Sequence, residues 1–542
     1  MKGSKNCKKM NISSKSMKRR KTLAVNEDSV REAYETLQKY KAGKASLEAR
    51  IIENEEWWRM RHYGKSDGDC VPSAWLFNSV INKHADAMDS LPDVTCLARE
   101  ESDRDAARLL TEVVPVILEQ NRFDATYSDC WYDKLKSGTA CYGVFWNCAL
   151  DGGAGNVDVR RVDILNLFWE PGISDLQHSK NIFHVELCDN SVLADKYPDL
   201  ADSLSSPGFD TSKYIYDDAV DTSDKSCVVD WYYKKQNGGR TVLHFAKFCN
   251  GVLLYASEND ENCKERGFYD HGMYPFFIDR MYPVQGSPCG FGVIDAMKGT
   301  QAQIDALGDS VVRNARMAAT RRFFVRSDGS LNEEEFADWR RPFVHYMGSG
   351  DPSSSIMPIE LPHLSDTYVA ILNNKIDELK ETSGNRDFSQ GTVSGGVTAA
   401  AAIEALQEAG SKTSRDILSS SYRTFEDICA TVIKLVRQFY TVPRCFRITG
   451  EAGGEEFIYC GTEDLSTQYG GEPVFDIKVR AHKKSAFSRA SMNELACELY
   501  KMGIFAPENS ESAQLCLEMM EFEGRDEILR RIKDNAARGA AL

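Results

Sequence analysis

The sequence predicts an α+β fold made of several structural units, in which helices flank a β-rich segment. The chain has 542 residues, which is too many for one ordinary hydrophobic core. Apolar residues recur every three or four positions before residue 139 and again after residue 293, as they do on helices. Between these parts, short stretches rich in β-branched and aromatic residues alternate with Gly, Asp, Asn and Pro, which is typical of strands and turns.

The first 292 residues are predicted to be helices followed by a sheet. Good helix formers with few breakers predict helices over about 28–62, 75–91, 102–120 and 122–139. The strands predicted after them are all short and apolar: 142–147, 157–162, 167–169, 182–186, 228–234, 241–249 and 252–255.

Long helices are predicted on either side of two irregular segments. Apolar positions that step by three, four or seven predict one helix over 293–320, about 40 Å long. A turn-rich segment with short strands (about 323–325, 343–347 and 356–361) separates it from a second helix, which starts at Ser365 or Asp366 and ends near Glu381.

A polar, glycine-rich loop at 382–397 follows, because its composition suits neither helix nor sheet. Thr398 is a good N-cap for a third helix that Pro443 ends, with a weak point at Gly410. The last 62 residues or so, 481–542, are again helical in pattern.

The chain is acidic overall but begins with a basic segment. Its net charge of −15 argues against tight, static binding to nucleic acid, although an acidic wall lets DNA slide past. Residues 1–21 hold nine Lys and Arg side chains and no acid, so 1–24 is predicted to be a basic disordered tail. An arm that binds DNA or capsid is the alternative. No apolar run approaches the roughly 18 residues of a membrane span, and no secretory signal is recognised.

No motif for catalysis, cofactor binding or metal binding stands out, so no catalytic residue, cofactor or metal ligand is predicted. The 16 Cys form no C-x-x-C pair, and none of the 9 His lies within four residues of another. Gly290-Phe-Gly292 lacks the third glycine of a dinucleotide fingerprint, and no P-loop is present. The chemistry therefore favours a non-enzymatic protein with reduced thiols.

Four local sequences in a fixed order carry a family resemblance. They are WLFN at 75–78, DILNLFWEP at 163–171, SGGVTAAAAIEALQEAGSK at 394–412 and KKSAFSRASMNEL at 483–495. Together with the order helix, β insertion, helix, loop and long helix, they resemble the portal proteins, or head-to-tail connectors, of tailed bacteriophages. The closest likeness is to portals from phages and prophages of Gram-positive bacteria.

The resemblance implies the portal fold, with long stem and wing helices and a β-rich wing module. Its expected parts are the wing at 25–292, first helical and then β-rich, a stem helix at 293–320, the clip at 321–363, a second stem helix at 364–381, the tunnel loop at 382–397, a long wing helix and strands at 398–480, and a helical crown at 481–542.

The resemblance also implies the function. Portals are rings of twelve subunits at one capsid vertex of the virion, assembled in the host cytoplasm, through which double-stranded DNA passes without sequence specificity during packaging and ejection. Expected partners are terminase, head-completion, adaptor or tail proteins, and the major capsid and scaffolding proteins, with no membrane.

Two groups of residues are candidate sites. In the tunnel loop, Asn385, Arg386, Asp387, Phe388, Ser389 and Gln390 are expected to meet DNA in the channel, and a disordered connector is the alternative. In the clip, a mixture of cation and aromatic residues is expected to dock partners, with ordinary packing as the alternative: Trp339, Arg340, Arg341 and Phe343.

Two other function classes remain as alternatives. A different oligomeric connector or scaffold would share the absence of catalytic motifs. A nucleic-acid-processing enzyme would need carboxylates or histidines from distant positions to gather in the fold.

Overall fold

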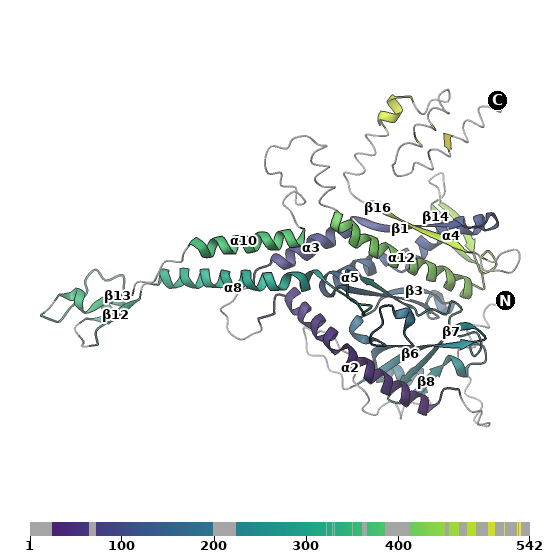
Figure 1. Cartoon of the computed structure of the whole chain (residues 1–542), viewed down its shortest axis with the longest axis horizontal. Helices are drawn as coiled ribbons and strands as arrows, with labels where there is room; N and C mark the ends of the chain where they lie inside the picture. The colour runs from purple at the N-terminus through teal and green to yellow at the C-terminus, as the bar shows by residue number, and fades with distance from the viewer. Residues whose placement is uncertain are drawn as a thin grey trace.

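The computed structural model describes residues 24–63, 72–198, 224–320, 322–327, 329, 331–349, 351–359, 366–384, 412–449, 455–465, 474–483 and 497–503, with positions 514, 517, 528, 531 and 532. These residues form a broad body of helices and sheets, from which a narrow helical stalk projects (Figure 1). A small β unit, here called the tip unit, lies at the far end of the stalk. The mixture of helices and sheets confirms the predicted α+β class.

The helices predicted before residue 139 are present. They are α2 (Glu27–Trp58), α3 (Trp75–Met88), α4 (Arg104–Gln120) and α5 (Phe123–Ser137). At the start of α2, Asn26 accepts a hydrogen bond from the Ser29 amide at 3.0 Å, which supplies one of the four amides that a helix leaves unpaired. At the end of α5, Gly138 has a φ of +81° and lies against the Phe291 backbone, so only glycine fits there.

The β-rich half of the body consists of antiparallel sheets. A five-stranded sheet has the order β4-β5-β6-β7-β8, and a three-stranded sheet has the order β3-β2-β9. All seven strands predicted between 142 and 255 are confirmed, whereas β9 was not predicted. The bounds are β2 (Thr139–Asn147), β3 (Asn156–Arg161), β4 (Leu167–Trp169), β5 (Asn181–Asp189), β6 (Lys225–Asn237), β7 (Arg240–Cys249), β8 (Val252–Ala256) and β9 (Phe276–Arg280).

The third long helix packs back onto the body. Its described part is α12 (Lys412–Phe439), and the residues predicted to begin it at 398–411 lie outside the described residues. Phe425, Ile428 and Val432 are buried in the main core with residues of α4, α5 and the three-stranded sheet. A second core lies between α2 and the five-stranded sheet. Both helices are therefore held by apolar burial.

Two short ladders complete the body, and the first joins segments that lie far apart in the chain. β1 (Ser90–Ala98) pairs antiparallel with β16 (Phe475–Lys483), and β14 (Arg444–Thr449) pairs with β15 (Glu455–Cys460). The sequence reading missed β1 because it placed a helix end near residue 91. Pro92 and Asp93 disfavour a strand locally, and the pairing partner lies more than 370 positions away.

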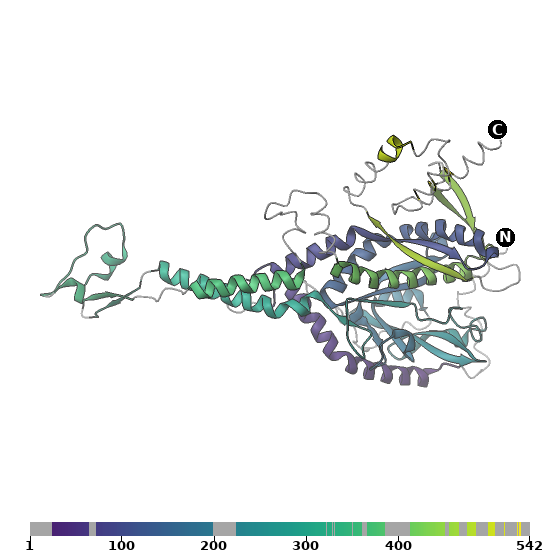
Figure 2. The same ribbon diagram turned by 45° about the horizontal axis from the view of Figure 1, so that its top comes forward.

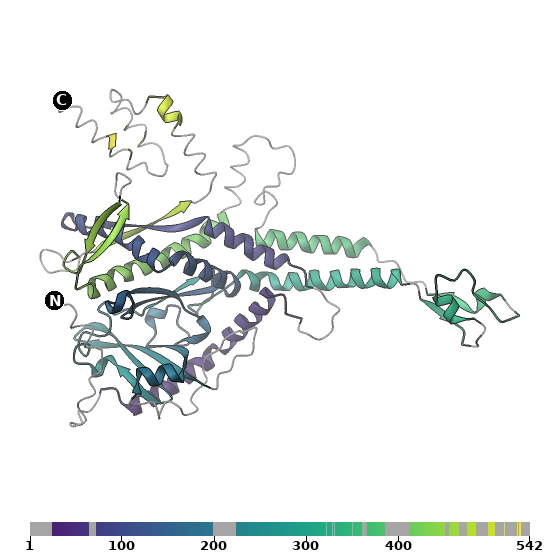
Figure 3. The ribbon, with the colours of Figure 1, turned by 180° about the vertical axis from the view of Figure 1, so that it is seen from behind.

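The stalk consists of α8 (Val293–Ala319) and α10 (Asp366–Ser383), which lie side by side in every view (Figures 2 and 3). The tip unit joins them through β12 (Phe323–Val325), α9 (Glu333–Ala337) and β13 (Ile356–Pro358). The strand predicted over 343–347 is wrong. Only Tyr346 makes a β-bridge there, to Leu331, and the side chains around it are mostly exposed, so no continuous partner strand is available.

A buried ion pair joins α5, β9 and α12. The Lys134 side chain is fully buried, and its Nζ lies 2.7 Å from Asp279 Oδ1. The same ammonium donates to Ser421 Oγ at 2.7 Å and to the Ile417 carbonyl at 3.1 Å. Ser421 in turn donates to Asp279 Oδ2 at 2.6 Å. Burial lowers the pKa of Lys134, and the carboxylate of Asp279 opposes that shift.

We expect Lys134→Met to lower the free energy of unfolding by roughly 3–5 kcal/mol, because the variant leaves Asp279 buried without its cation. Urea titrations followed by tryptophan fluorescence measure this. The double variant Lys134→Met/Asp279→Leu should recover most of the loss.

The matched control is Arg99→Met, which breaks the exposed pair between Arg99 and Asp476 at 2.6 Å. It should cost less than about 1 kcal/mol. A cost for Lys134→Met no larger than that of Arg99→Met would contradict a structural role for the buried pair.

Candidate functional site

The stalk has too little protein around it to bury its own side chains. The buried residues of α8 all lie in its first half, between Val293 and Asp305. In its second half Val312 and Met317 are exposed, and on α10 Tyr368, Val369 and Ile371 are exposed. Only Leu379 and Ser383 of α10 are buried, at the end nearest the body. An exposed apolar stalk of this kind marks an interaction surface.

Polar side chains of α8 fix the stalk to the body. Asp305 accepts hydrogen bonds from the Ser73 amide at 2.8 Å, the Ser73 hydroxyl at 2.6 Å and the Tyr63 hydroxyl at 3.2 Å. One turn earlier, Gln301 Oε1 accepts from the Leu76 amide at 3.1 Å. Because the N-cap residue of α3 makes no side-chain cap, α8 itself supplies the cap of α3.

One exposed face of α8 carries uncharged side chains, and all but Gln303 are small. Its members recur every three or four residues: Ala296, Gly299, Gln303, Ala306 and Ser310. A Cβ built on Gly299 or on Gly308 would meet no atom within 4 Å. Packing within the chain therefore gives no reason for glycine at either position, although each costs the helix about 1 kcal/mol relative to alanine.

The tip unit exposes apolar side chains on a small framework. Trp339 is 85% exposed and Phe343 is 77% exposed. The Arg340 guanidinium lies 5.5 Å from the Trp339 ring centre, and Arg341 pairs with Asp338 at 3.4 Å. The predicted site residues of this segment therefore lie at one exposed unit, but Trp339 and Phe343 do not form a core.

The other predicted site falls outside the described residues. Asn385, Arg386, Asp387, Phe388, Ser389 and Gln390 all lie within 385–411, of which nothing is described. The two ends of that segment are described. α10 continues through Thr382 and Ser383, two residues further than predicted, and Gly384 closes it with a φ of +72°. α12 then resumes at the body, where Ile417 and Ser421 bind Lys134.

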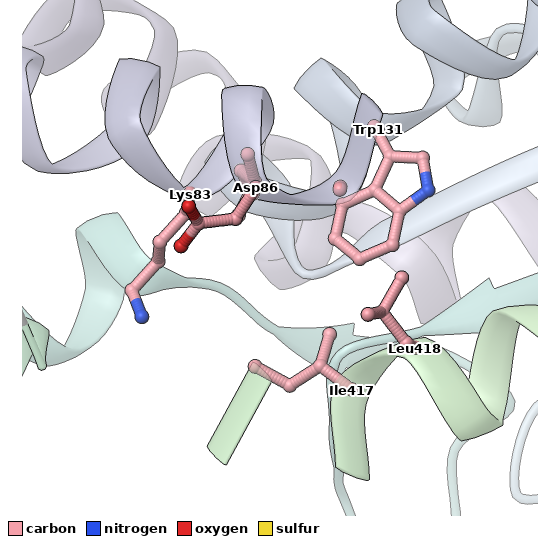
Figure 4. A pocket seen from close by; sticks show the side chains of 7 residues that line it. Lys83, Asp86, Trp131, Ile417 and Leu418 are labelled. Carbon is pink, nitrogen blue, oxygen red and sulfur yellow. The ribbon is translucent and has the colours of Figure 1, made fainter. Parts of the chain in front are cut away.

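A small hollow lies between α3, α5 and α12, close to this junction (Figure 4). Lys83 and Asp86 stand at one side of it, and Trp131, Ile417 and Leu418 line the other. Burial lowers the pKa of Lys83 and raises that of Asp86, and each charge opposes the shift of the other. The hollow has room for about one water molecule, so it does not suit a nucleotide or a cofactor.

The described residues were also searched for a metal site and for a membrane-spanning helix. Among the described residues, no three His, Cys, Asp or Glu side chains gather as metal ligands would. Nor does any helix in the described ranges have the length and apolar character needed to cross a membrane.

A comparison of the sequence with models of known families identifies the family to which the chain is similar. A sequence model of the phage P22-like portal protein family matches residues 85–268 and 265–541. The chain belongs to this portal family. The match confirms the resemblance to portal proteins of tailed phages, and three of the four motifs lie inside the matched ranges, whereas WLFN at 75–78 precedes them. Among curated proteins, none matches the sequence.

Membership in the portal family implies a ring subunit at the capsid vertex of a bacteriophage virion. Portal proteins are generally structural and not enzymes. Sequence reasoning missed the polar residues that fix this portal's stalk and long helix, namely Lys134, Gln301 and Asp305. Nothing in the local sequence distinguishes a buried lysine or aspartate from an exposed one on an amphipathic helix.

Proposed function

We propose that this portal protein forms a ring, of twelve subunits as the family resemblance implies, whose channel conducts double-stranded DNA during packaging and ejection. In this proposal the stalk is the stem, the tip unit is the clip, and the body is the wing. The proposal rests on the exposed apolar side chains of the stalk. Two antiparallel helices that leave apolar side chains exposed in the half toward the tip unit need neighbours on both sides, and a ring of copies supplies them.

The uncharged face of α8 is our candidate for the contact between neighbouring stems. Gly299 and the small side chains beside it allow another helix to approach closely. A heterologous contact of this kind closes into a ring when the rotation between copies is right. The exposed residues of α10 would then contact the neighbouring subunit on the other side.

We expect Gly299→Leu to raise the stability of the monomer by roughly 0.5–1 kcal/mol, because leucine is the better helix former, its Cβ would meet no atom within 4 Å, and the position is exposed. The same variant should assemble fewer rings, because the added side chain occupies the space of the neighbouring helix. Urea titration of the monomer and electron microscopy of assembled material measure the two effects.

Ala45→Leu, at an exposed position within α2, is the control for added bulk and should leave the ring fraction unchanged. Wild-type ring yield from Gly299→Leu would exclude this face of α8 as the contact between subunits.

We further propose that the segment 385–397 is the tunnel loop and meets DNA in the channel. Its support is its place in the chain, between the body end of the second stem helix and the anchored start of α12. Arg386 is suited to contact phosphate while Asp387 limits the attraction, and Asn385, Ser389 and Gln390 offer hydrogen bonds that do not depend on base sequence.

Deletion of 385–395 should leave rings intact but reduce the amount of DNA that is packaged or retained. The deletion starts at Asn385 because Ser383 still belongs to α10 and is buried there. Electron microscopy assesses the ring, and nuclease-protected DNA in capsids assesses packaging. A Gly/Ser replacement of equal length separates the need for these side chains from the need for length. Normal packaging by ring-forming deletion particles would refute the role of the loop.

The tip unit is our candidate for docking terminase during packaging and adaptor or tail proteins afterwards. Its support is the density of exposed aromatic and cationic side chains on a unit that stands clear of the body (Figure 1). Aromatic residues and arginine are the residue types that dominate binding energy at protein interfaces.

The double variant Trp339→Ala/Phe343→Ala should weaken binding to terminase or adaptor by about tenfold or more, since each side chain is free to be buried by a partner. Stability and ring formation should not change. Val192→Ala, at an exposed apolar residue of α6 (Asn190–Lys196) in the body, is the control. Both partners binding the double variant with wild-type affinity would remove these residues from the docking surface.

A further inference from the structure

β16 is an edge strand that pairs along its full length with β1 and, within the described ranges, with no other strand. The ladder runs over nine residues of β16, from Lys483 opposite Ser90 to Phe475 opposite Ala98, and neither a bulge nor a proline interrupts it on this strand. Both strands lie at the surface of the body, along its upper border in Figure 1. A long, regular edge of this kind is a template for a further strand.

The hydrogen bonds of Cys96 on β1 show which backbone groups of β16 face away from the ladder. The Cys96 amide donates to Thr111 Oγ1 of α4 at 3.0 Å, and the same oxygen lies 3.2 Å from the Cys96 carbonyl oxygen. The backbone groups of Cys96 therefore point away from β16, and those of the opposite residue, Ile477, point away from β1. Since this arrangement recurs at every second pair, the amides of Phe475 and Val479 have the same direction as that of Ile477.

The two edges of this ladder differ in what covers them. The Thr111 hydroxyl satisfies the Cys96 amide, so α4 covers the outer edge of β1. On β16, no backbone group of the described residues pairs with the outward amides of Phe475, Ile477 and Val479. The side chains of these three residues pack against the main core, which holds the strand in place. The outer edge of β16 is therefore a fixed row of backbone donors and acceptors that needs a partner.

The hairpin of β14 and β15, here called the aromatic hairpin, also lacks a partner. Phe446 lies on its inner side and is 4% exposed. On its outer side, Phe457 is 62% exposed and Tyr459 is 65% exposed. Outside the tip unit, the only other large hydrophobic side chains of the described residues that are more than 60% exposed are Tyr500 and Met502. Because the hairpin has only two strands, β15 has an open edge beside its exposed rings.

We propose that the aromatic hairpin of one copy adds β15 to the outer edge of β16 in the next copy, so that one sheet continues from body to body. The inference rests on the proposed ring, in which each copy presents a different surface to each of its two neighbours. The β16 edge and the hairpin are two such surfaces, and neither covers the other within one chain. In this type of contact, main-chain hydrogen bonds supply affinity and side chains select the partner.

The solvent-facing side chains of β16 favour the hairpin over a second β16. Lys478 is exposed in the middle of the strand. Two β16 strands paired with each other would place two copies of this lysine in one short ladder, which is unfavourable, and would close a dimer and not a ring. An aromatic ring beside Lys478 covers its alkyl chain and attracts its ammonium instead. Phe457 and Tyr459 provide such rings on β15.

Hydrogen exchange of the full chain, followed by mass spectrometry in the isolated monomer and in assembled rings, tests the proposal. The outward amides within a peptide of residues 474–480 should exchange about tenfold or more slowly in the ring than in the monomer. The Cys96 amide, which Thr111 already holds, is the internal control and should exchange equally in both forms. Equal exchange of the β16 peptide in monomer and ring overturns the proposal, whether its own chain covers the edge or nothing does.

The double variant Phe457→Ser/Tyr459→Ser tests the hairpin as the partner of the edge. It should lower the ring yield by about fivefold or more, and the β16 peptide should lose its protection in the rings that remain. Because both side chains are exposed in the single chain, the stability of the monomer should not change. Val192→Ser, at a residue of α6 that is 58% exposed, is the matched control. Wild-type yield and protection from the double variant overturn the proposal.

A disulfide between copies identifies the strand that occupies the edge. The background for this experiment has Ser in place of the exposed thiols and of those outside the described residues: Cys7, Cys70, Cys445, Cys497 and Cys516. In this background Tyr459→Cys/Lys478→Cys should give a series of covalent oligomers when rings are oxidised, and neither single variant should do so. A disulfide that forms equally in the isolated monomer shows pairing within one chain and overturns the proposal.

Electron microscopy of the same samples separates this inference from the proposed function. Rings in which the β16 edge stays unprotected overturn the inference alone. A chain that forms no ring in capsids overturns the proposed function, and the inference with it.

Discussion

The stalk of this portal protein consists of only two packed helices, α8 and α10. Two helices cannot cover each other on every side. The apolar residues of the stalk are buried only where α8 and α10 enter the body, and they become exposed toward the tip unit. Because apolar surface of this extent is costly in water, the isolated chain is an incomplete structure. In the proposed ring, neighbouring copies cover this surface, and glycine on the exposed face of α8 lets one of them approach closely.

Buried polar groups of the body hold two long helices, α8 and α12, in place. Asp305 and Gln301 fix α8 to the start of α3, and Lys134 fixes α12 to α5 and β9. Such groups add little net stability compared with apolar side chains of equal size, but they have strict geometric requirements. They set the direction in which each helix leaves the core, and a ring can close only if every copy presents the same direction.

Much of this plan could be predicted from the sequence because the helices and most strands carry their own periodic patterns. α8 begins at the predicted residue and ends one residue earlier than predicted, and the strands from β2 to β8 follow β-branched and aromatic runs. β1 and the polar network could not be predicted in this way. The partner of β1 is β16, and the partners of Lys134 lie 145 to 287 positions along the chain, so only the folded structure brings them together.

The candidate sites, too, could be predicted from the sequence only in part. Trp339 and Phe343 were selected by residue type, and the structure places them at an exposed unit, but residue type alone does not show exposure. The loop residues 385–390 were selected by composition and by resemblance, and their role stays a proposal. The face of α8 was not selected, since Ala, Gly and Ser in a helix carry no chemical signal until their surroundings are known.

The ammonium of Lys134 also has a mechanical meaning. It holds α12 through Ile417 and Ser421 at once, while Ser421 is tied separately to Asp279. A pull on α12 from the residues that precede it would reach these bonds near the start of the helix, so more than one of them must break before α12 moves. A joint of this type resists sudden tension far better than a single bond, and it lies between the segment proposed to touch moving DNA and the core that must not yield.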